Sequence, residues 1–331
     1  MVKTLTISIA AYNVEKFLNK TLDSLIIKNM DLLEVLIVND GSKDKTLEIA
    51  KRYEKKYPQT FKVINKENGG YGSTINAGIK NATGKYFKQL DGDDWYVTDN
   101  LNKLCQDLEK INEDMIYTPY ITHHIGTLVE ETIDNNIENY SKLTKLDDVI
   151  NNCIPEFAMH NLTFKTEILK NKNITIDENC FYTDTEYIVF PLIYCNTIKI
   201  LDYPIYVYRI GDVNQSVGRL GRIKHQNDHY RMSYSLLEKY NQIEKTSNNV
   251  KDYLDNYLAS VFASGVANYL MVLKPNIKNY KLIKKYNKDI KKTSLNVYKL
   301  MNKKSKTVHC IRNFKFPAYF IINKLKEIRG R

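Results

Sequence analysis

The sequence predicts an α/β fold with a mostly parallel sheet flanked by helices, followed by an α-helical C-terminal region. In the first part of the chain, short apolar runs rich in β-branched residues alternate with amphipathic stretches of helical period. From about residue 222 onward, apolar residues recur only at three- and four-residue spacing, which indicates helices. A length of 331 residues allows two domains. We expect a sheet-containing domain over residues 1–217 and a helical region over 218–331.

The N-terminal elements follow the order strand, helix, strand, as expected for βαβ units. Because such units place the carboxyl ends of parallel strands at one edge of the sheet, residues 10–13, 40–42 and 91–94 should meet there. The sequence therefore predicts an acidic crevice at this edge. The expected elements are strand 4–10, helix 15–28, strand 34–38, helix 44–57, strand 61–65, helix 73–82 and strand 85–90.

A carboxylate cluster ends the fourth expected strand, where the chain reads QLDGDDW. Asp91, Asp93 and Asp94 cannot be buried together as ions without a cation or strong donors. Hard oxygen ligands suit Mg²⁺ or Mn²⁺, although D-G-D-D by itself is also a common polar turn. An EF-hand loop is excluded because Tyr96 and Asn102 occupy the positions where it needs Gly and Glu. No GxxxxGK[ST] or GxGxxG loop occurs.

Composition favours a soluble protein of a reducing compartment. Hydrophobic residues make up 43% of the chain, and no apolar run approaches the ~18 residues that span a bilayer. The five cysteines are widely spaced and form no CxxC pair, which disfavours a zinc site or redox motif. The short apolar run at residues 5–11 lacks a cleavage site and predicts a strand instead of a signal peptide. We therefore expect a cytoplasmic protein.

The net charge of +11 is concentrated in the last part of the chain. Residues 274–331 contain 18 basic and 2 acidic residues, whereas the preceding 273 residues carry a net charge of −5. Such a tail indicates an anionic partner, but no nucleic-acid-binding motif accompanies the charge, so we expect no nucleic-acid partner.

The final stretch has the pattern of a basic amphipathic helix. Such a helix binds the anionic surface of a membrane, here the inner face of the cell membrane, as a peripheral attachment. The alternative is a helix that docks on its own domain and exposes a basic face. The apolar residues at helical spacing are Phe316, Tyr319, Phe320, Leu325 and Ile328.

Four segments, in order and spacing, resemble the family 2 glycosyltransferases, which have the GT-A fold. They read SIAAYNVEKFLNKTLDSL, EVLIVNDGSKDKT, NGGYGSTINAGIKNATGKYF and QLDGDDW. The resemblance is strong over about residues 3–110 and looser over 160–217, and it does not include the tail. It implies an acceptor-side part at about 111–217. Nucleotidyltransferases and haloacid-dehalogenase phosphatases are disfavoured, because the loop after the first strand lacks their Gly/Arg-rich or D-x-D signatures.

The resemblance implies a nucleotide site around the ends of the first two strands. Asp40 matches the acidic residue that accepts a hydrogen bond from the base, although an Asx-turn is an alternative role for it. Ala10 and Tyr12 match the lining of the base pocket, with Ala10 in place of the family's commoner Pro. Asn68 and Gly70 match residues beside the donor. Where the family often has Arg, this chain has Ile75, which puts one base or phosphate contact in doubt.

Asp91 and Asp93 match the family's D-x-D motif. The resemblance implies that Asp93 ligates a divalent cation, Mn²⁺ or Mg²⁺, and that Asp91 contacts the donor ribose or the metal's water shell. Gly92 would allow close approach of the sugar nucleotide. Asp94 and Trp95 would lie in the donor or acceptor pocket. For Trp95, the only tryptophan, a core position is an equal alternative.

The resemblance also implies a general base about ninety residues after the D-x-D motif. The matching segment is FYTDTEY, and we predict that Asp184 is the base that deprotonates the acceptor hydroxyl. A simple helix cap is the alternative role of Asp184. Glu186, predicted in the donor or acceptor pocket, is the second candidate for the base.

The segment Y-x-Y-R followed by Q-S-V resembles a flap that covers the donor diphosphate. Arg209 and Ser216 are the implied phosphate contacts, and a surface salt bridge is the alternative for Arg209. His225 and His229 have i, i+4 spacing, which is compatible with a metal. A helix face is the preferred interpretation for them.

The resemblance thus implies a metal-dependent, inverting glycosyltransferase. The donor would be a nucleoside-diphosphate sugar of the UDP type. The acceptor would be a hydroxyl of a glycan or polyprenyl-linked glycan in surface-polysaccharide or wall-polymer synthesis. The alternative is a catalytically silent module that keeps the GT-A fold and binds a membrane surface.

Overall fold

The computed structural model describes residues 3–127, 129–134, 140–153, 156–211, 219–245, 247–272 and 274–328. The chain divides into two units, Met1–Gly211 and Asp212–Arg331. The first unit contains both β-sheets, and the described part of the second is helical.

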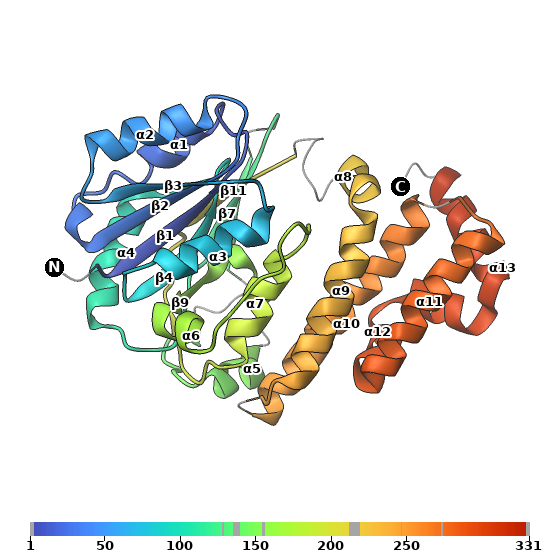
Figure 1. The fold of residues 1–331 in the computed structure, drawn as a ribbon. Coiled ribbons are helices and arrows are strands. Elements are labelled where there is room, and N and C mark those ends of the chain that lie inside the picture. The colour runs from blue at the N-terminus through green and yellow to red at the C-terminus, as the bar shows by residue number, and fades with distance from the viewer. Residues whose placement is uncertain are drawn as a thin grey trace. The chain divides into compact units, whose positions relative to one another are not determined.

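The larger sheet of the first unit is mostly parallel, and its strands lie side by side in Figure 1. Its central strands are almost completely buried, as expected for a sheet covered on both faces. Only β9 runs antiparallel to its neighbours β4 and β6. In spatial order the strands are β10 (Ile198–Ile200), β6 (Met115–Tyr117), β9 (Leu162–Lys165), β4 (Tyr86–Asp91), β1 (Leu5–Ala11), β2 (Leu33–Asp40) and β3 (Phe61–Lys66).

Helices cover the two faces of this sheet. In Figure 1, α1 (Leu18–Asp23) and α2 (Thr46–Lys56) lie on one side and α3 (Tyr71–Asn81) lies on the other. This arrangement is the one that right-handed crossovers give, because the chain moves from β1 to β3 in one direction and then returns to β4. α3 packs closely on β1 at Gly78, where a Cβ would come within 2.1 Å of the Ser8 hydroxyl oxygen.

α1 is shorter than the sequence predicts. The expected helix over residues 15–28 is helical only over Leu18–Asp23. Ser24 turns its hydroxyl back onto the Thr21 carbonyl at 2.6 Å, and the following residues continue in tight turns instead of a helix. Such side-chain bonds compete with helix propagation, which explains the early end.

A second, smaller sheet has the order β5-β11-β7-β8. β5 follows the carboxylate cluster directly and pairs antiparallel with β11, where Trp95 is opposite Val207. This pairing holds two segments that are far apart in the sequence next to each other. The strands are β5 (Trp95–Tyr96), β11 (Tyr206–Ile210), β7 (Tyr120–His124) and β8 (Glu130–Ile133).

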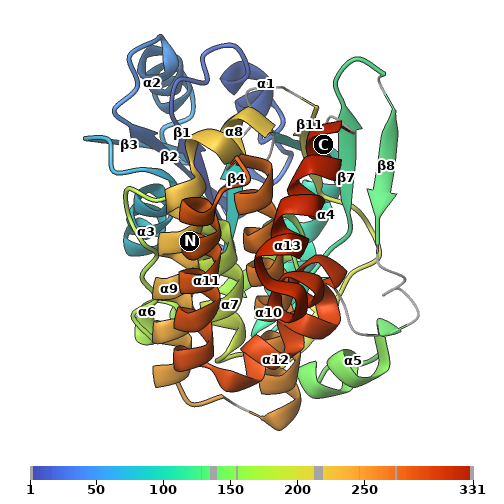
Figure 2. The same cartoon turned by 90° about the vertical axis from the view of Figure 1, so that its right-hand side faces the viewer.

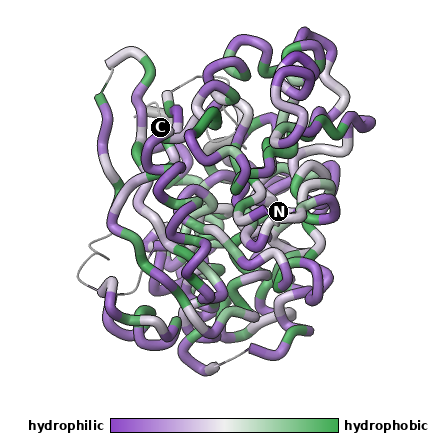
Figure 3. The backbone as a smooth tube through the Cα atoms, turned by 90° about the vertical axis from the view of Figure 1, so that its left-hand side faces the viewer, coloured by the Kyte–Doolittle hydropathy of each residue, from purple (hydrophilic) through white to green (hydrophobic). Residues whose placement is uncertain are grey.

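The remaining helices of the first unit surround the sheets, and Figure 3 shows hydrophobic backbone segments of this unit in green between hydrophilic ones in purple. α7 is the most buried of them, since Thr185 to Leu192 are all buried. These elements are η1 (Met30–Leu32), α4 (Thr98–Lys110), α5 (Leu146–Cys153), η3 (Met159–Asn161), α6 (Thr166–Asn171) and α7 (Asp184–Leu192).

The second unit is built on a long central helix, α10, which contacts α8, α9, α12 and α13. Polar caps set the start of two later helices. The Asn276 side chain accepts from the Asn279 backbone N–H at 2.8 Å, and Ser294 accepts from Val297 at 3.3 Å. The helices, visible in Figure 2, are α8 (Arg219–Lys224), α9 (Gln226–Gln242), α10 (Asn248–Val272), α11 (Ile277–Thr293), α12 (Leu295–Lys304) and α13 (Lys306–Ile328).

α13 is kinked at Lys315, whose φ of 54° and ψ of −136° are not helical. After the kink, Tyr319 is completely buried and donates a hydrogen bond to the Lys274 carbonyl, so the helix docks within its own unit. Other apolar side chains of the same helix, among them Phe320 and Leu325, stay exposed. In the part of the chain that the structure describes, no helix is both long and apolar enough to span a membrane.

Candidate active site

The strand register brings the predicted polar residues to one edge of the larger sheet. Ala10 is opposite Asp91 across the β1–β4 pair, and Asp40 is opposite Lys66 across the β2–β3 pair. β1 and β2 are in turn aligned so that Ala11 is opposite Asn39. The sequence prediction that the strand ends meet at this edge is therefore confirmed.

Asp40 holds the glycine-rich loop before α3. One carboxylate oxygen, Oδ1, accepts from the Gly69 backbone N–H at 2.9 Å and from the Lys66 ammonium at 2.7 Å. The other, Oδ2, accepts from the Gly70 N–H at 2.9 Å. Gly70 has φ 81°, a conformation that glycine adopts without strain. The Asn68 side chain donates to the Asp40 carbonyl at 2.9 Å. Asp40 thus shapes the loop, and its contact with a base remains a prediction.

Tyrosine hydroxyls bind the carboxylates of Asp91 and Asp94. Tyr71, the first residue of α3, donates to Asp91 Oδ1 at 2.7 Å. The Tyr206 hydroxyl donates to Asp94 Oδ2 at 2.6 Å and accepts from the Asp91 backbone N–H at 3.2 Å. The Thr21 hydroxyl also lies within hydrogen-bond distance of the Asp94 carbonyl, at 2.7 Å. These bonds fix the turn in one conformation.

Asp93 is the accessible member of the cluster. Its side chain is 29% exposed and pairs with the Arg209 guanidinium at 2.7 Å. Arg209 also donates its backbone N–H to Asp94 Oδ1 at 2.8 Å, and its guanidinium lies 4.0 Å from the centre of the Phe17 ring. The β5–β11 pairing makes this contact possible. The ion pair does not exclude the phosphate contact that we predicted for Arg209, which stays a prediction.

The cluster is electrostatically strained. The pKa of Asp91 is raised to about 7, chiefly by burial and further by the negative charges of Asp93 and Asp184. The hydrogen bond from Tyr71 acts in the opposite direction. Burial and the two other carboxylates raise the pKa of Asp94 well above its ordinary value. The site therefore favours a bound proton or cation near neutral pH.

Asp184 is the first residue of α7 and belongs to the same electrostatic cluster, since its charge acts on both Asp91 and Tyr71. Its side chain is exposed to solvent. The surrounding protein nevertheless displaces enough water to raise its pKa, while the N–H groups at the start of α7 act in the opposite direction. An accessible carboxylate with a raised pKa is suited to take up a proton.

Glu186 lies two residues beyond Asp184 on α7, and its side chain is completely buried. One of its carboxylate oxygens accepts from the Asp177 backbone N–H at 2.7 Å. Helical period turns this side chain from the accessible end of α7 toward the core. The place of Glu186 in the donor or acceptor pocket stays a prediction.

The other predicted site residues lie in or near the turn. Gly92 donates its N–H to the Ala10 carbonyl at 3.0 Å, and a Cβ on Gly92 would come within 2.8 Å of that oxygen. Tyr12 is half exposed and therefore accessible to a ligand. Trp95 is partly exposed, with the Lys20 ammonium 3.1 Å from its ring centre. Ser216 lies outside the described residues.

The histidine pair of the second unit has partners within its own helix. His225 lies 3.1 Å from an Asp228 carboxylate oxygen, and His229 is buried beside the Ser233 hydroxyl. Burial lowers the pKa of His229 to about 4. These contacts agree with the helix-face interpretation.

Sequence reasoning missed three groups that shape the site. Lys66 pairs with Asp40, Tyr71 binds Asp91, and Tyr206 binds Asp94 and the turn. Tyr206 belongs to the Y-x-Y-R segment, so that motif carried a usable signal. A lysine at the end of β3, in register with Asp40, is a second such signal, whereas Tyr71 becomes recognisable only in the folded chain.

The residues present fit a divalent cation as part of a larger ligand set. Among the described residues, no group of three or more His, Cys, Asp and Glu side chains could hold a metal by itself. Asp91 and Asp93 would supply two hard oxygen ligands, and a bound diphosphate and water would supply the others. In this structure the Arg209 guanidinium is paired with Asp93 Oδ2. Arg209 would have to move away from this oxygen if Oδ2 is to bind the cation.

The first unit has the GT-A fold, an α/β architecture with acidic side chains at the carboxyl edge of its parallel strands. The chain belongs to glycosyl transferase family 2: the family's model matches residues 6–171, half of the chain. The resemblance found in the sequence is thereby confirmed.

Curated relatives match part of the chain. EpsJ of Bacillus subtilis (strain 168), described as an uncharacterized glycosyltransferase, is 27% identical over 213 residues, which cover 63% of this chain and 62% of EpsJ. GgaB of the same organism, a minor teichoic acid biosynthesis protein, is 33% identical over 177 residues, or 51% of this chain and 19% of GgaB. The match thus spans about three fifths of EpsJ and a fifth of GgaB.

Solved structures extend the likeness in fold. S. aureus TarS, residues 1–349, in complex with UDP-GlcNAc has a TM-score of 0.65 at 17% identity, covering 99% of this chain and 92% of that one. The mannosyltransferase PcManGT from Pyrobaculum calidifontis, in complex with GDP-Man and Mn²⁺, has a TM-score of 0.52 at 14% identity, covering 100% of this chain and 88% of that one.

Proposed function

We propose that this protein transfers a sugar from a UDP-sugar to a hydroxyl of a glycan or lipid-linked acceptor, with inversion at the anomeric carbon. The observation that carries the proposal is the cluster formed by Asp91, Asp93, Asp94 and Asp184. These carboxylates come from two distant segments, and all four act electrostatically on Tyr208, at the edge where parallel α/β sheets bind ligands. Membership of glycosyl transferase family 2 agrees with this proposal.

Asp184 is the general base in this proposal. It accepts the proton of the acceptor hydroxyl as that oxygen attacks the anomeric carbon, and the diphosphate leaves from the opposite side. The raised pKa of Asp184 brings its basicity closer to that needed near neutral pH. Its position at the N-terminus of α7 orients the carboxylate through the backbone N–H groups of Asp184 and Thr185.

Asp91 and Asp93 would hold the divalent cation together with the donor diphosphate. When bound, the cation would neutralise charge on the diphosphate. The residues of the chain do the rest of the positioning: Tyr71 and Tyr206 keep the carboxylate turn rigid, and Arg209 supplies a guanidinium beside Asp93. Support for a metal comes from PcManGT, whose structure contains Mn²⁺ with GDP-Man.

The nucleotide would lie along the ends of β1 and β2. Among the described residues, Asp40 Oδ1 accepts from Lys66, Gly69 and Ser73, whereas Oδ2 accepts from Gly70 alone, and we propose that Oδ2 also accepts from the base. The TarS complexes with UDP-GlcNAc and UDP support a uridine nucleotide.

The acceptor proposal rests on the relatives. GgaB carries a teichoic acid function in its name, and we propose a related surface glycan or wall polymer as acceptor here. We further propose that the protein works at the inner face of the membrane, attached through exposed apolar residues of α13. Phe320, Ile321 and Leu325 are 42%, 57% and 47% exposed, and Lys324 and Lys326 flank Leu325.

A donor screen tests this function. Nucleotide release should be measured for UDP-, GDP- and dTDP-sugars with Mn²⁺ or Mg²⁺, and the anomeric configuration of the product should be read by NMR. We expect UDP release that depends on a metal and requires Asp184. Retention of configuration would refute the direct displacement, and the absence of turnover with every donor would favour a silent binding module.

A further inference from the structure

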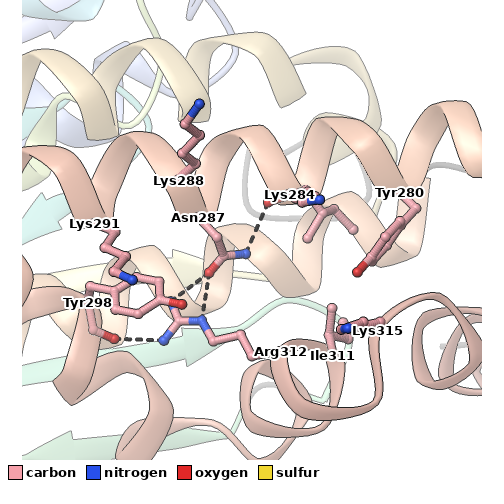
Figure 4. Close-up of a pocket in the computed structure, with 10 residues that line it drawn as sticks. Tyr280, Lys284, Asn287, Lys288, Lys291, Tyr298, Ile311, Arg312 and Lys315 are labelled. Atoms are coloured by element: carbon pink, nitrogen blue, oxygen red, sulfur yellow. Dashed lines mark hydrogen bonds between the residues drawn. The ribbon is translucent and has the colours of Figure 1, made fainter.

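The second unit contains a basic cavity that the proposed function does not use. It has a volume of about 290 Å³ and is lined by one face of α11 together with residues of α12 and α13. Five of the lining side chains are cationic, and none is acidic: Lys284, Lys288, Lys291, Arg312 and Lys315. Figure 4 shows that they come from helices facing one another across the opening.

Arg312 is the fixed centre of this cavity. Its guanidinium donates Nε–H to Asn287 Oδ1 at 2.9 Å and Nη1–H to the Tyr298 carbonyl at 2.7 Å, as the dashed lines in Figure 4 show. The guanidinium also stacks 3.6 Å from the centre of the Tyr298 ring. These partners are all neutral, so the positive charge is held in place without being compensated.

A half-buried arginine normally pairs with a carboxylate, since an uncompensated charge is costly away from water. Burial lowers the pKa of Arg312 to about 10, and yet the guanidinium remains charged at neutral pH. Nη1 uses one of its two hydrogens for Tyr298, which leaves the other for a ligand.

Lysines surround this guanidinium. The Lys291 ammonium lies 5.6 Å from the centre of the Tyr298 ring. Lys284 lies one heptad earlier on the same side of α11. Lys315 lies at the kink of α13, where the backbone leaves the helical conformation beside the cavity. Lys288 points away from Arg312 in Figure 4. Among the described residues, Lys284, Lys291 and Lys315 form no salt bridge with a carboxylate.

We propose that this cavity binds a phosphate group carrying more than one negative charge, such as a diphosphate. A planar guanidinium held rigid by neutral partners and flanked by mobile ammonium groups matches phosphate oxygens, which accept several charge-assisted hydrogen bonds. Such a group occurs free, in soluble diphosphates, and as the phosphomonoester headgroup of phosphatidic acid. The inference does not depend on the transfer reaction, because every residue involved belongs to the second unit.

Inorganic pyrophosphate is the probe for this site. Calorimetry on the full chain should be done at low ionic strength with EDTA, so that metal-dependent binding at the carboxylate cluster does not contribute. The test variant is Lys284→Gln/Lys291→Gln, which breaks no side-chain hydrogen bond among the residues that the structure describes. Its matched control, Lys281→Gln/Lys292→Gln, removes the same charge from exposed positions of the same helix that do not line the cavity. We expect the test variant to lose about tenfold or more in affinity and the control to keep most of it.

A second arm identifies the source of the phosphate. Full-length protein is mixed with vesicles of phosphatidic acid and phosphatidylcholine, with and without pyrophosphate. Vesicle binding that pyrophosphate displaces supports the site with a lipid headgroup as ligand, and pyrophosphate binding without vesicle binding supports it with a soluble phosphate. Equal losses in the test and control variants, or no pyrophosphate binding to the wild-type protein, would overturn the proposal.

Discussion

The two units both gather charges of one sign, but they treat those charges differently. At the end of β4, each aspartate of the cluster has a hydrogen-bond donor: Tyr71 for Asp91, Arg209 for Asp93, and Tyr206 for Asp94. In the second unit, the cavity lysines are solvated and unpaired with carboxylates in the part of the chain that is described, and Arg312 has only neutral partners.

The comparison shows that internal partners decide what a charged cluster can do. Carboxylates that are already bound lie in fixed positions and present a prepared geometry to a cation and a donor, as catalysis requires. Cations without compensating partners provide attraction with little geometric constraint, as anchoring or recognition of an anion requires. One feature is common to both units: the buried Lys88 of the first and the half-buried Arg312 of the second each donate to neutral oxygens.

The largest expected effect concerns the prepared geometry of the first unit. Asp184→Asn keeps the size of the side chain but cannot accept a proton, so sugar transfer should fall by roughly a hundredfold or more. Donor binding, measured by calorimetry, should be unchanged. In the wild-type enzyme, activity should rise with pH through the raised pKa of Asp184, because the base acts when deprotonated. Near-normal turnover of the variant would exclude Asp184 as the base.

The next effect concerns the accessible carboxylate. Asp93→Ala should weaken metal-dependent binding of UDP by roughly ten- to a hundredfold, because one ligand of the cation is lost. The fold should remain intact, since removing one carboxylate relieves repulsion with Asp91 and Asp94. Calorimetry with UDP and Mn²⁺ measures the change, and binding without metal provides the control. Unchanged affinity would show that Asp93 does not hold the cation.

A smaller effect concerns attachment of the second unit. Phe320→Ser/Ile321→Ser/Leu325→Ser should reduce binding to phosphatidylglycerol vesicles by about tenfold, because exposed apolar side chains anchor such a helix. Deleting the end of α13 is a poorer test, since the buried Tyr319 and Asn323 would be lost as well.

The matched control for this experiment is Leu282→Ser/Leu295→Ser, which removes two apolar side chains that are 44% and 51% exposed on α11 and α12. Equal vesicle binding by the triple variant and the wild-type protein would mean that α13 serves only to close the helical unit.

The smallest effect is a difference in the pH dependence of stability. Burial lowers the pKa of Lys88 to about 7 in the folded protein, whereas the unfolded chain holds this proton up to about 10.5. Between these pH values the unfolded state binds more protons, so Lys88 makes stability rise with pH, by at most about 1.4 kcal/mol per pH unit.

Lys88→Met should remove this contribution. Chemical denaturation at several pH values between 7 and 10 would measure the free energy of unfolding of the variant and of the wild-type protein. The contribution of Lys88 is the difference between the two pH profiles. The buried tyrosines with a raised pKa cancel in this difference, because both proteins contain them. Parallel pH profiles would show that Lys88 stays charged in the folded state.

The local pattern of the chain determined the main outline of the fold. The apolar runs around Ile7, Ile37 and Leu90 predicted buried strands at the observed places, because period and burial are encoded within a few neighbouring residues. The position of the carboxylates at the end of β4 followed from the same pattern, together with the rule that parallel strands end at one edge. The helices of the second unit were likewise predicted from apolar spacing.

Only the tertiary structure decided which side chains complete the site. Arg209 meets Asp93 because β11 pairs with β5, and Tyr206 reaches Asp94 through the same sheet. Glu186 turned inward although its neighbour Asp184 stayed accessible. Likewise, Arg312 received neutral partners in place of a carboxylate. Local sequence fixes the periodicity of each element, but the partners of a charged group depend on strand order and helix packing, which are set by contacts between distant residues.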